Sequence, residues 1–256
     1  MSRSFAVCSS RRPGTSQMSE LSRSSMSRTD GIVRSGGWVP ITRCDCLGGS
    51  AAASLIENEQ RHLPVIAEWM VPVQIPVPVV AGSPDQDFPW PWSVVPWFAG
   101  DAGLKVARAV RSDWAEPLAT CLGRLHATAP NEFPANPYLG VPLTARHSSL
   151  AERLVRAKAD MPAPVVRRLE EVWGRGLAAE PWRGRPIWIH GDLHPGNILA
   201  DHGRLVAIID FGDVTDGDPA YDLAIAWLAF DTCGRAAFGD ATNGAYDQAT
   251  WDRAHA

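Results

Sequence analysis

The sequence predicts a fold of the α+β class, in which short strands and longer helices occupy different stretches of the chain. Unbroken apolar runs at 187–189 and 205–209 contain β-branched or aromatic residues, and such runs are typical of short buried strands. Apolar residues recur at helical spacing over 113–127, 148–159 and 164–179, and each stretch is long enough for several helical turns. The second half of the chain is therefore expected to be mainly helical.

Two polar turns follow the predicted strands and carry the most informative residues of the chain. The first reads His-Gly-Asp-Leu-His-Pro-Gly-Asn over 190–197, and the second reads Asp-Phe-Gly-Asp over 210–213. An antiparallel hairpin between them would bring Asp192, Asn197 and Asp210 towards one point. Hard oxygen ligands of this type suit Mg²⁺ that carries nucleotide phosphates.

Phosphoryl transfer needs a carboxylate that orients the attacking hydroxyl, together with metal ligands that neutralise the charge of the phosphates. An Asp, an Asn five residues later and a distal Asp-Phe-Gly supply these groups here. In this order they resemble the catalytic loop and metal-binding turn of the aminoglycoside phosphotransferase family, small-molecule kinases that are related in fold to protein kinases and include macrolide phosphotransferase-like members. The resemblance covers residues 50–256 and is closest over 181–232.

The resemblance implies a two-lobed, protein-kinase-like fold with a small mixed amino-terminal lobe and a mainly helical carboxy-terminal lobe. It makes Asp192 the catalytic base and assigns Mg²⁺ to Asn197 and Asp210. His190 would support the catalytic loop from behind, and Asp222 would hold its backbone from below, a buried position in which a carboxylate needs hydrogen bonds. The implied reaction moves the γ-phosphoryl group of ATP or GTP to a hydroxyl of a small molecule, an aminoglycoside-like or macrolide-like antibiotic.

The same resemblance implies residues at the nucleotide site. A helix predicted from Ser50 carries Glu59, which matches the family's carboxylate that pairs with a strand cation, although a solvated helix face is an equally good interpretation. The stretch 88–98 resembles the hinge between the lobes, where backbone groups can bind a purine. Trp97 and Phe98 end this stretch, and we expect their side chains to pack in the core rather than to stack on the base.

The segment 35–49 departs from the family pattern. It should carry a hairpin that covers the nucleotide and a basic residue on a central strand, but it shows no alternating strand and no lysine, and Pro40 would remove a ladder hydrogen bond. Arg43 is the only nearby cation. One explanation is a frameshift or other damage in the coding sequence before Ser50. We therefore predict weak nucleotide binding and a poorly anchored helix around Glu59.

Other interpretations of these motifs remain open. Each turn could be an ordinary loop in which glycine permits a positive φ. A metal hydrolase could use His190, Asp192 and His194 as transition-metal ligands, although the remaining histidines fall outside any recognisable spacing. A non-catalytic remnant with a damaged nucleotide lobe is the alternative from another functional class, and family members usually continue for several helices beyond the position of Ala256.

Three further features are assigned structural roles. Asp218 is expected to cap a helix that runs to Phe230, and His126, at the end of a helix, is assigned no chemistry. The stretch 71–80 alternates Val or Ile with Pro, so it is expected to be extended and edge-like rather than a central strand.

The expected domain order is a disordered Ser- and Arg-rich segment at 1–34, an incomplete nucleotide lobe with the hinge at 35–100, and a catalytic lobe at 101–256. A net charge of −4 and a pI near 6.0 argue against general affinity for nucleic acid or anionic membranes. No apolar run approaches the ~20 residues that span a bilayer. The five cysteines form no disulfide framework, so we expect a cytoplasmic protein. The partners that the family resemblance implies are a nucleoside triphosphate and a small hydroxylated substrate.

Overall fold

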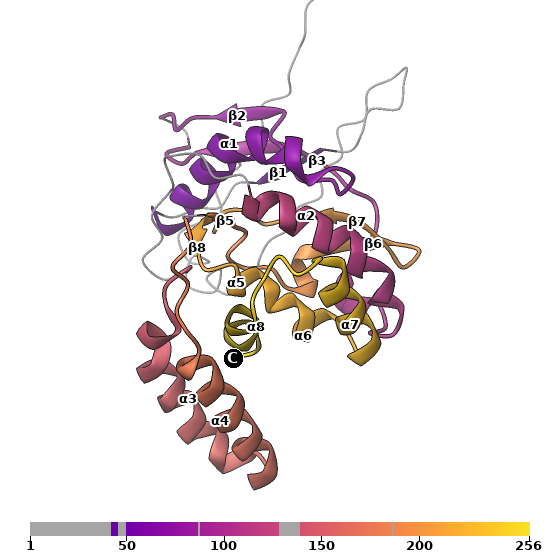
Figure 1. Cartoon of the computed structure of the whole chain (residues 1–256). Helices are drawn as coiled ribbons and strands as arrows, with labels where there is room; N and C mark the ends of the chain where they lie inside the picture. The colour runs from indigo at the N-terminus through magenta and orange to yellow at the C-terminus, as the bar shows by residue number, and fades with distance from the viewer. Residues whose placement is uncertain (1–41, 46–49, 87, 128–138, 186) are drawn as a thin grey trace, which may run out of the picture. The chain divides into compact units, whose positions relative to one another are not determined.

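Short strands and amphipathic helices follow one another along the chain, as the sequence predicts (Figure 1). The segment predicted to be disordered, 1–34, lies outside the residues that the structure describes. The backbone alone is described at 42–45 and 50–52. The structure is a computed structural model, and it describes residues 42–45, 50–86, 88–127, 139–185 and 187–256.

The first sheet is antiparallel, and its central strand is β3, Trp92–Pro96, which lies between β1, Thr42–Asp45, and β2, Val80–Gly82. In this register Arg43 lies opposite Val95. The prediction that the nucleotide lobe has no strand before its helix is therefore wrong. The four residues Thr-Arg-Cys-Asp show no apolar alternation, and their extended conformation depends on the hydrogen-bond ladder from β3.

The proline-rich stretch 71–80 begins with a turn and a bend at 71–73, so the predicted extended segment is only partly correct, and only Val80 enters β2 at the edge of the sheet. Val73 and Ile75 are buried. Between them, the backbone N of Gln74 donates to the carbonyl of Val206 at 3.1 Å. The stretch thus connects the first sheet with the strands of the catalytic hairpin.

Helix α1, Ser50–Met70, contacts β3 and packs its apolar face in the core. Gln60 fastens the helix to the sheet, because its Nε2 donates to the carbonyl of Trp92 at 2.8 Å. The core face of the helix consists of apolar residues that recur at helical spacing. These are Ile56, Leu63, Ile66 and Met70.

The predicted catalytic hairpin is present as β6, Ile198–Asp201, and β7, Arg204–Ile208. Its two-residue turn has positive φ angles at His202 and Gly203, 47° and 80°, which is the geometry that matches the twist of paired strands. The remaining strands form two further antiparallel pairs. They are β4, Asp101–Ala102, with β6, and β5, Ile187–Ile189, with β8, Thr215–Gly217.

Helix α2, Ala115–Ala127, is the central helix of the second half of the chain, and it contacts both α1 and β5. Its predicted apolar stripe is buried, as at Leu118 and Leu125. It begins two residues later than predicted, because Val110–Trp114 form a 3₁₀ helix. The remaining helices are α3, His147–Asp160; α4, Ala163–Ala178; α5, Ala220–Leu223; α6, Ile225–Ala229; α7, Thr232–Ala241; and α8, Gln248–His255.

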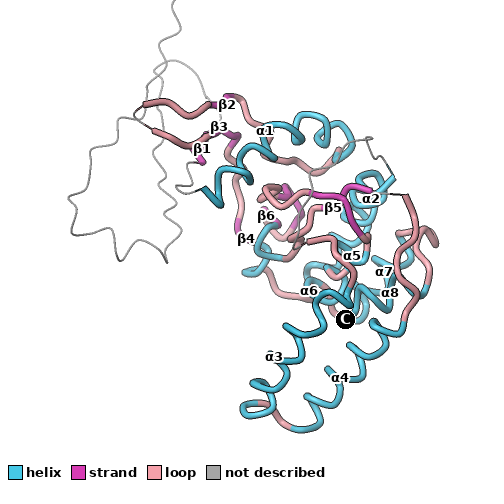
Figure 2. Tube along the Cα trace, turned by 90° about the vertical axis from the view of Figure 1, so that its left-hand side faces the viewer, coloured by secondary structure: helices cyan, strands magenta, loops and turns pink. Residues whose placement is uncertain are grey.

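Helices α3 and α4 lie side by side, as Figures 1 and 2 show, and the prediction for their buried face is only partly correct. Trp173 is buried on α4, but Val165 and Leu169 are 45% and 41% exposed, and Val166 is buried instead. Helix α4 contacts α3 and α8, and α3 has no buried side chain. A face of α4 that is turned away from both neighbours therefore remains exposed. None of the helices in the described part of the chain combines the length and apolar character that crossing a membrane requires.

The single helix predicted to run to Phe230 is two short helices, α5 and α6. They meet at Ala224, whose φ and ψ of −56° and −22° are still helical. The break therefore changes the hydrogen-bond pattern more than the direction of the chain. Helix α8 contacts both α5 and α4, so three elements that are distant in sequence meet at this end of the catalytic half.

Candidate active site

The loop between β5 and β6 carries the residues predicted to be catalytic. It ends in a 3₁₀ turn at Pro195–Asn197. The Asn197 Nδ2 donates to the backbone carbonyl of Asp192 at 2.9 Å and to its Oδ2 at 3.3 Å. The backbone N of Ile209 donates to the carbonyl of Asn197 at 2.9 Å, which places Asp210 next to this loop. The fold therefore brings Asp192, Asn197 and Asp210 into one neighbourhood.

Asp210 begins the second polar turn in the left-handed region, with a φ of 67°. Aspartate tolerates this region better than most residues do. The turn leaves the Asp210 side chain exposed while the next residue, Phe211, is fully buried. The ring centroids of Phe211 and His190 lie 4.5 Å apart. A buried aromatic residue thus holds the turn in place, and the carboxylate before it remains accessible to a ligand.

His190 is buried behind the loop, and both of its ring nitrogens contact the backbone. Nε2 lies 3.1 Å from the carbonyl of Ile209, and Nδ1 accepts from the backbone N of Asp192 at 3.3 Å. A carbonyl can only accept, so these partners assign the neutral tautomer with the proton on Nε2. The ring therefore ties the catalytic loop to the strand that precedes Asp210, which fits the supporting role that the resemblance implies.

Asp222 lies fully buried on α5, below the start of the catalytic loop. Its Oδ2 accepts from the backbone N of His190 at 2.8 Å, and its Oδ1 accepts from that of Gly191 at 3.1 Å. Gly191 has a φ of 85°, and a Cβ there would lie 2.6 Å from the carbonyl oxygen of Asp213, so no other residue fits. The carboxylate thus fixes two successive peptide groups of the loop.

His126 and Tyr246 continue this hydrogen-bond chain into the core. The His126 Nε2 lies 3.1 Å from Asp222 Oδ2, and its Nδ1 lies 2.7 Å from the Tyr246 hydroxyl. Burial by itself raises the pKa of Asp222, but the hydrogen bond from His126 and its charge outweigh burial and lower the pKa below its ordinary value. Burial and the charge of Asp222 raise the pKa of Tyr246, which keeps its hydroxyl protonated. The sequence prediction gave His126 no role and missed Tyr246, since only their spatial contact reveals them.

Two consecutive residues of α1 bind the Asp-Phe-Gly turn. Glu59 is buried, and its Oε1 accepts from the backbone N of Phe211 at 2.9 Å. The Asn58 Nδ2 donates to the carbonyl of Gly212 at 3.1 Å. At Gly212 an added Cβ would lie 2.7 Å from the Cβ of Leu55, so the helix approaches the turn closely. The prediction of a poorly anchored helix is therefore wrong, and of the two interpretations of Glu59 the solvated face is excluded. Asn58 is a contact that sequence reasoning missed.

Comparison with known proteins identifies the family to which this chain belongs. The sequence model described as the phosphotransferase enzyme family, APH, matches residues 46–256. The chain belongs to this family. Aminoglycoside 3'-phosphotransferases of Escherichia coli and Salmonella typhimurium are each 30% identical to this phosphotransferase family member over 112 residues, which are 44% of this chain and 41% of each relative. The match thus spans less than half the length of these curated relatives.

Solved structures share the fold of this family member at low sequence identity. The GDP and kanamycin complex of APH(2")-IIia is 18% identical, with a TM-score of 0.63, and the match covers 93% of this chain and 84% of that one. The macrolide 2'-phosphotransferase MphH from Brachybacterium faecium is 18% identical, with a TM-score of 0.52 and coverage of 84% and 72%. These likenesses confirm the predicted two-lobed, protein-kinase-like α+β fold.

The stretch predicted to be the hinge, 88–98, contains β3 and ends with Trp97 and Phe98. The Trp97 side chain is 40% exposed, and Phe98 is partly buried. The expectation that both side chains pack in the core is therefore wrong for Trp97. Burial alternates along the strand, with Ser93 and Val95 inside, but the strand ends at Pro96, so the two-residue period does not extend to Trp97.

The metal hydrolase alternative has no ligand set among the described residues, where no three His, Cys, Asp or Glu side chains are grouped so as to hold a metal ion. Both ring nitrogens of His190 already contact the backbone, and Nδ1 of His194 accepts a backbone N–H of its own loop at 2.9 Å. Asn197 and Asp210 offer hard oxygen atoms instead. Because the Asn197 amide nitrogen donates within the loop, its amide oxygen is the atom that would meet a cation such as Mg²⁺.

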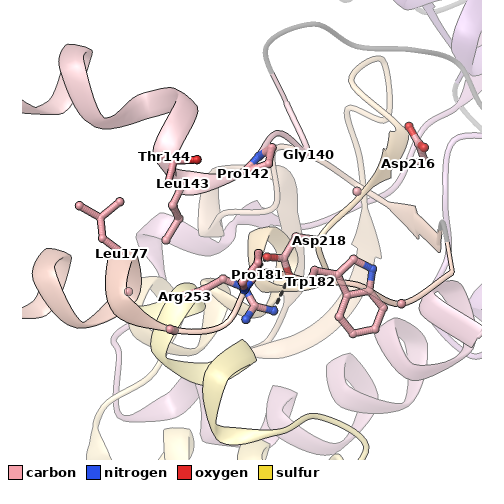
Figure 3. Close-up of a pocket in the computed structure, with 14 residues that line it drawn as sticks. Gly140, Pro142, Leu143, Thr144, Leu177, Pro181, Trp182, Asp216, Asp218 and Arg253 are labelled. Carbon is pink, nitrogen blue, oxygen red and sulfur yellow. Dashed lines mark hydrogen bonds and ion pairs between the residues drawn. The ribbon is translucent and has the colours of Figure 1, made fainter.

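A cavity of about 470 Å³ lies where the segment before α3 and the end of α4 approach β8 and α8 (Figure 3). Its apolar wall includes Leu143, Leu177 and Trp182, and Asp218 and Arg253 line its polar side. The carboxylate of the catalytic loop does not belong to this lining. The cavity is therefore separate from the convergent residues described above, although it shares the elements that support them.

Proposed function

We propose that this chain transfers the γ-phosphoryl group of ATP or GTP to a hydroxyl group of a small molecule, an aminoglycoside-like or macrolide-like antibiotic. The observation that carries the proposal is the hydrogen-bonded pair of Asp192 and Asn197 with Asp210 beside it. One carboxylate for the attacking hydroxyl and two oxygen ligands for a cation are the groups that phosphoryl transfer requires. The relatives support the substrate class, since one similar structure is a GDP and kanamycin complex and another is a macrolide 2'-phosphotransferase.

In the proposed reaction Asp192 is the catalytic base. Its carboxylate accepts the proton of the acceptor hydroxyl as that oxygen bonds to the γ-phosphorus, and the bond between the γ-phosphorus and the β,γ-bridging oxygen breaks to leave a nucleoside diphosphate. The Asn197 Nδ2 donates to Oδ2 and restricts rotation of the carboxylate, which leaves Oδ1 for the hydroxyl. The Asp192 side chain is 53% exposed, so an acceptor can reach it.

Asn197 and Asp210 would hold Mg²⁺, which neutralises charge on the nucleotide phosphates when it is bound. The chain restricts both ligands. Asn197 is held through its amide nitrogen, and Asp210 is followed by Phe211, whose ring is buried and whose backbone N donates to Glu59. Because these side chains are already held in place, less conformational entropy is lost when a cation binds.

The nucleotide would contact residues of the proposed nucleotide lobe, 35–100, and the catalytic lobe, 101–256, would bind the acceptor. Backbone groups at Trp97 and Phe98 would hydrogen-bond the purine, and the exposed Trp97 ring can cover one face of the base. Arg43 lies on β1, the strand that precedes α1, and we propose it as the cation for the phosphates. The anchored α1 weighs against the non-catalytic remnant, because a damaged nucleotide lobe would not keep these contacts.

The test is incubation of the purified chain with Mg²⁺, ATP or GTP, and individual aminoglycosides and macrolides. Mass spectrometry and phosphorus NMR of the acceptor should detect a phosphate monoester on one hydroxyl, and the product should disappear with Asp192→Asn. Release of phosphate to water alone, with no acceptor modified by either donor, would refute the proposal.

A further inference from the structure

Arg253 on α8 is a buried arginine with several hydrogen bonds, and none of them is to the catalytic loop (Figure 3). Its Nε donates to Asp218 Oδ2 at 2.6 Å, and its Nη2 donates to Asp218 Oδ1 at 3.2 Å. Nη2 also donates to the Thr250 hydroxyl at 3.1 Å, and Nη1 donates to the backbone carbonyl of Glu180. The guanidinium thus joins three different segments of the chain.

This ion pair differs from the surface pairs of the protein in geometry and burial. The side chains of Arg253 and Asp218 are only 5% and 12% exposed. Two parallel N–H···O contacts to one carboxylate define both the distance and the orientation of the partners. Removal of one partner would leave the other charge buried and uncompensated. By contrast, Arg183 is 3.9 Å from Glu180 with its side chain 80% exposed.

The first segment that Arg253 holds is the entrance to α5. Asp218 Oδ1 accepts from the backbone N of Ala220, the first residue of that helix, but the N-cap position is Pro219, so the predicted capping role is only partly correct. One turn later Asp222 receives the backbone N–H groups of His190 and Gly191. The position of the catalytic loop therefore depends on α5, and the position of α5 depends on the ion pair.

The second segment is the helical pair α3 and α4. Glu180 follows α4, and its carbonyl accepts from Arg253. At the same end of the pair Arg146 precedes α3, and its Nε donates to the hydroxyl of Tyr221 at 2.8 Å. Tyr221 is adjacent to the buried carboxylate of α5. The chain that enters α3 and the chain that leaves α4 are thus both tied to the region of the helix that supports the catalytic loop.

We propose that Arg253 is a positioning residue for phosphoryl transfer, which holds α5 under the catalytic loop through Asp218 and couples the α3–α4 pair to it through Glu180. This inference rests on the proposed function and deepens it. The hydrogen bonds of Arg253 go to Asp218, Glu180 and Thr250 and not to the catalytic loop. It acts through the Asp222 carboxylate, which determines where the loop presents Asp192.

The test compares the full chain with Arg253→Gln, which removes the charge and keeps most of the side-chain volume. We expect kcat to fall by about tenfold to a hundredfold, since a small misplacement of a reacting group is enough for this. Calorimetric affinity for ATP or GTP in the absence of Mg²⁺ should stay unchanged, because the contacts of α1 and the first sheet do not involve Arg253. Hydrogen exchange should accelerate at the amides of His190 and Gly191, which donate to α5.

Arg183→Gln is the matched control, because it removes another arginine that faces Glu180 but is largely exposed. It should change neither kcat nor the exchange of the two loop amides. Asp218→Asn provides a second route if Arg253→Gln folds poorly. In a double-mutant cycle the two changes should give little more loss together than either alone, because they remove the same interaction.

Two outcomes would overturn the proposal. One is a lower melting temperature for Arg253→Gln with unchanged kcat and unchanged loop-amide exchange well below that temperature, since this would make the pair merely structural. The other is additive losses in the cycle. The exchange measurement needs no acceptor, so it tests the positioning role even if no phosphotransferase activity is found, and the two failures are distinguishable.

Discussion

Asp192 and Asp201 form a natural comparison at the level of single residues. Both carboxylates are 53% exposed, and each lies near a histidine, at 3.6 Å from His194 and 3.8 Å from His202. Only Asp192 lies beside Asn197. The two positions therefore separate the chemistry of the catalytic loop from the general effect of losing an exposed negative charge.

We predict that Asp192→Asn lowers kcat by about a thousandfold or more and leaves the melting temperature unchanged, because the amide keeps the shape of the side chain but cannot accept the hydroxyl proton. Steady-state kinetics on a verified acceptor, together with thermal melting, measure both effects. Asp201→Asn should retain full turnover. A folded Asp192→Asn protein with near-normal turnover would show that this loop is not the catalytic centre.

Asp210→Asn should weaken Mg²⁺-dependent nucleotide binding by about tenfold or more, since one negative ligand of the cation is lost. Asparagine is the appropriate replacement, because Asp210 has a φ of 67° and asparagine tolerates that conformation without strain. Calorimetric titration of ATP with and without Mg²⁺ measures the change. Equal binding by the variant and the unmodified chain, or tight stoichiometric zinc in the purified protein, would contradict the assignment.

At the scale of the element, the most important feature of the short helix α5 is its buried carboxylate, Asp222. Asp222 accepts the backbone N–H groups of His190 and Gly191 and contacts His126 Nε2. Burial raises the pKa of this carboxylate, but the hydrogen bond and the charge of His126 outweigh burial and lower the pKa below its ordinary value. A group with a lowered folded pKa stabilises the protein fully above its ordinary pKa, and this contribution is lost as pH falls through the folded pKa.

We predict that Asp222→Asn lowers the free energy of unfolding at neutral pH by about 3 kcal/mol, the cost of breaking a buried network. The difference from the unmodified chain should shrink below about pH 4, where the unmodified chain loses the same contribution. Urea unfolding at a series of pH values measures both. A difference that stays constant down to acid pH would show that the carboxylate charge contributes nothing to stability.

Helix α1 is the second element whose function depends on contacts at one turn. Asn58 and Glu59 bind the Asp-Phe-Gly turn, and the next residue, Gln60, binds the carbonyl of Trp92 in the first sheet. Three successive polar residues thus connect the proposed metal site with β3.

At the scale of the whole molecule, the proposed activity depends on nucleotide binding by the segment predicted to be the nucleotide lobe, 35–100. One reason for predicting weak nucleotide binding, the absence of a recognisable strand in 35–49, is contradicted at Thr42–Asp45, and the expected poor anchoring of Glu59 is wrong. A second reason, a missing nucleotide-covering hairpin, concerns residues outside the described part of the chain, and the third, the absence of a well-placed lysine, still holds in the sequence. Weak binding therefore stays a prediction, and low-micromolar affinity of the unmodified chain for Mg²⁺ and ATP or GTP would contradict it.

Arg43→Gln tests the proposed phosphate cation directly. We predict a loss of about thirtyfold in nucleotide affinity, which corresponds to about 2 kcal/mol for an opposite charge near a triphosphate. Arg61→Gln, a change at an exposed position of α1, is the control and should bind as the unmodified chain does. Equal affinities of all three proteins for ATP and GTP would remove Arg43 from the nucleotide site.

The sequence by itself determined the features that depend on neighbouring residues. The hairpin follows from apolar strands around a turn that His202 and Gly203 can form, and the spacing of Asp192 and Asn197 predicts their common loop. Asp222 and His190 were predicted through the family resemblance, and the structure gives them the expected contacts. Such features depend on turn residues and on the spacing of apolar residues, and both are set within a few neighbouring positions of the sequence.

Tertiary structure alone decided the contacts between distant segments. His126 meets Tyr246 across 120 positions of sequence, and Arg253 meets Asp218 across 35. The strand at Thr42–Asp45 likewise exists because β3 supplies its hydrogen-bond partners, although its own residues show no alternation. Polar side chains of this kind look like ordinary surface residues in the sequence. Packing of the core excludes water from these side chains. Without water, a buried polar group that lacks a hydrogen-bond partner, or a buried charge that lacks an opposite charge, destabilises the fold.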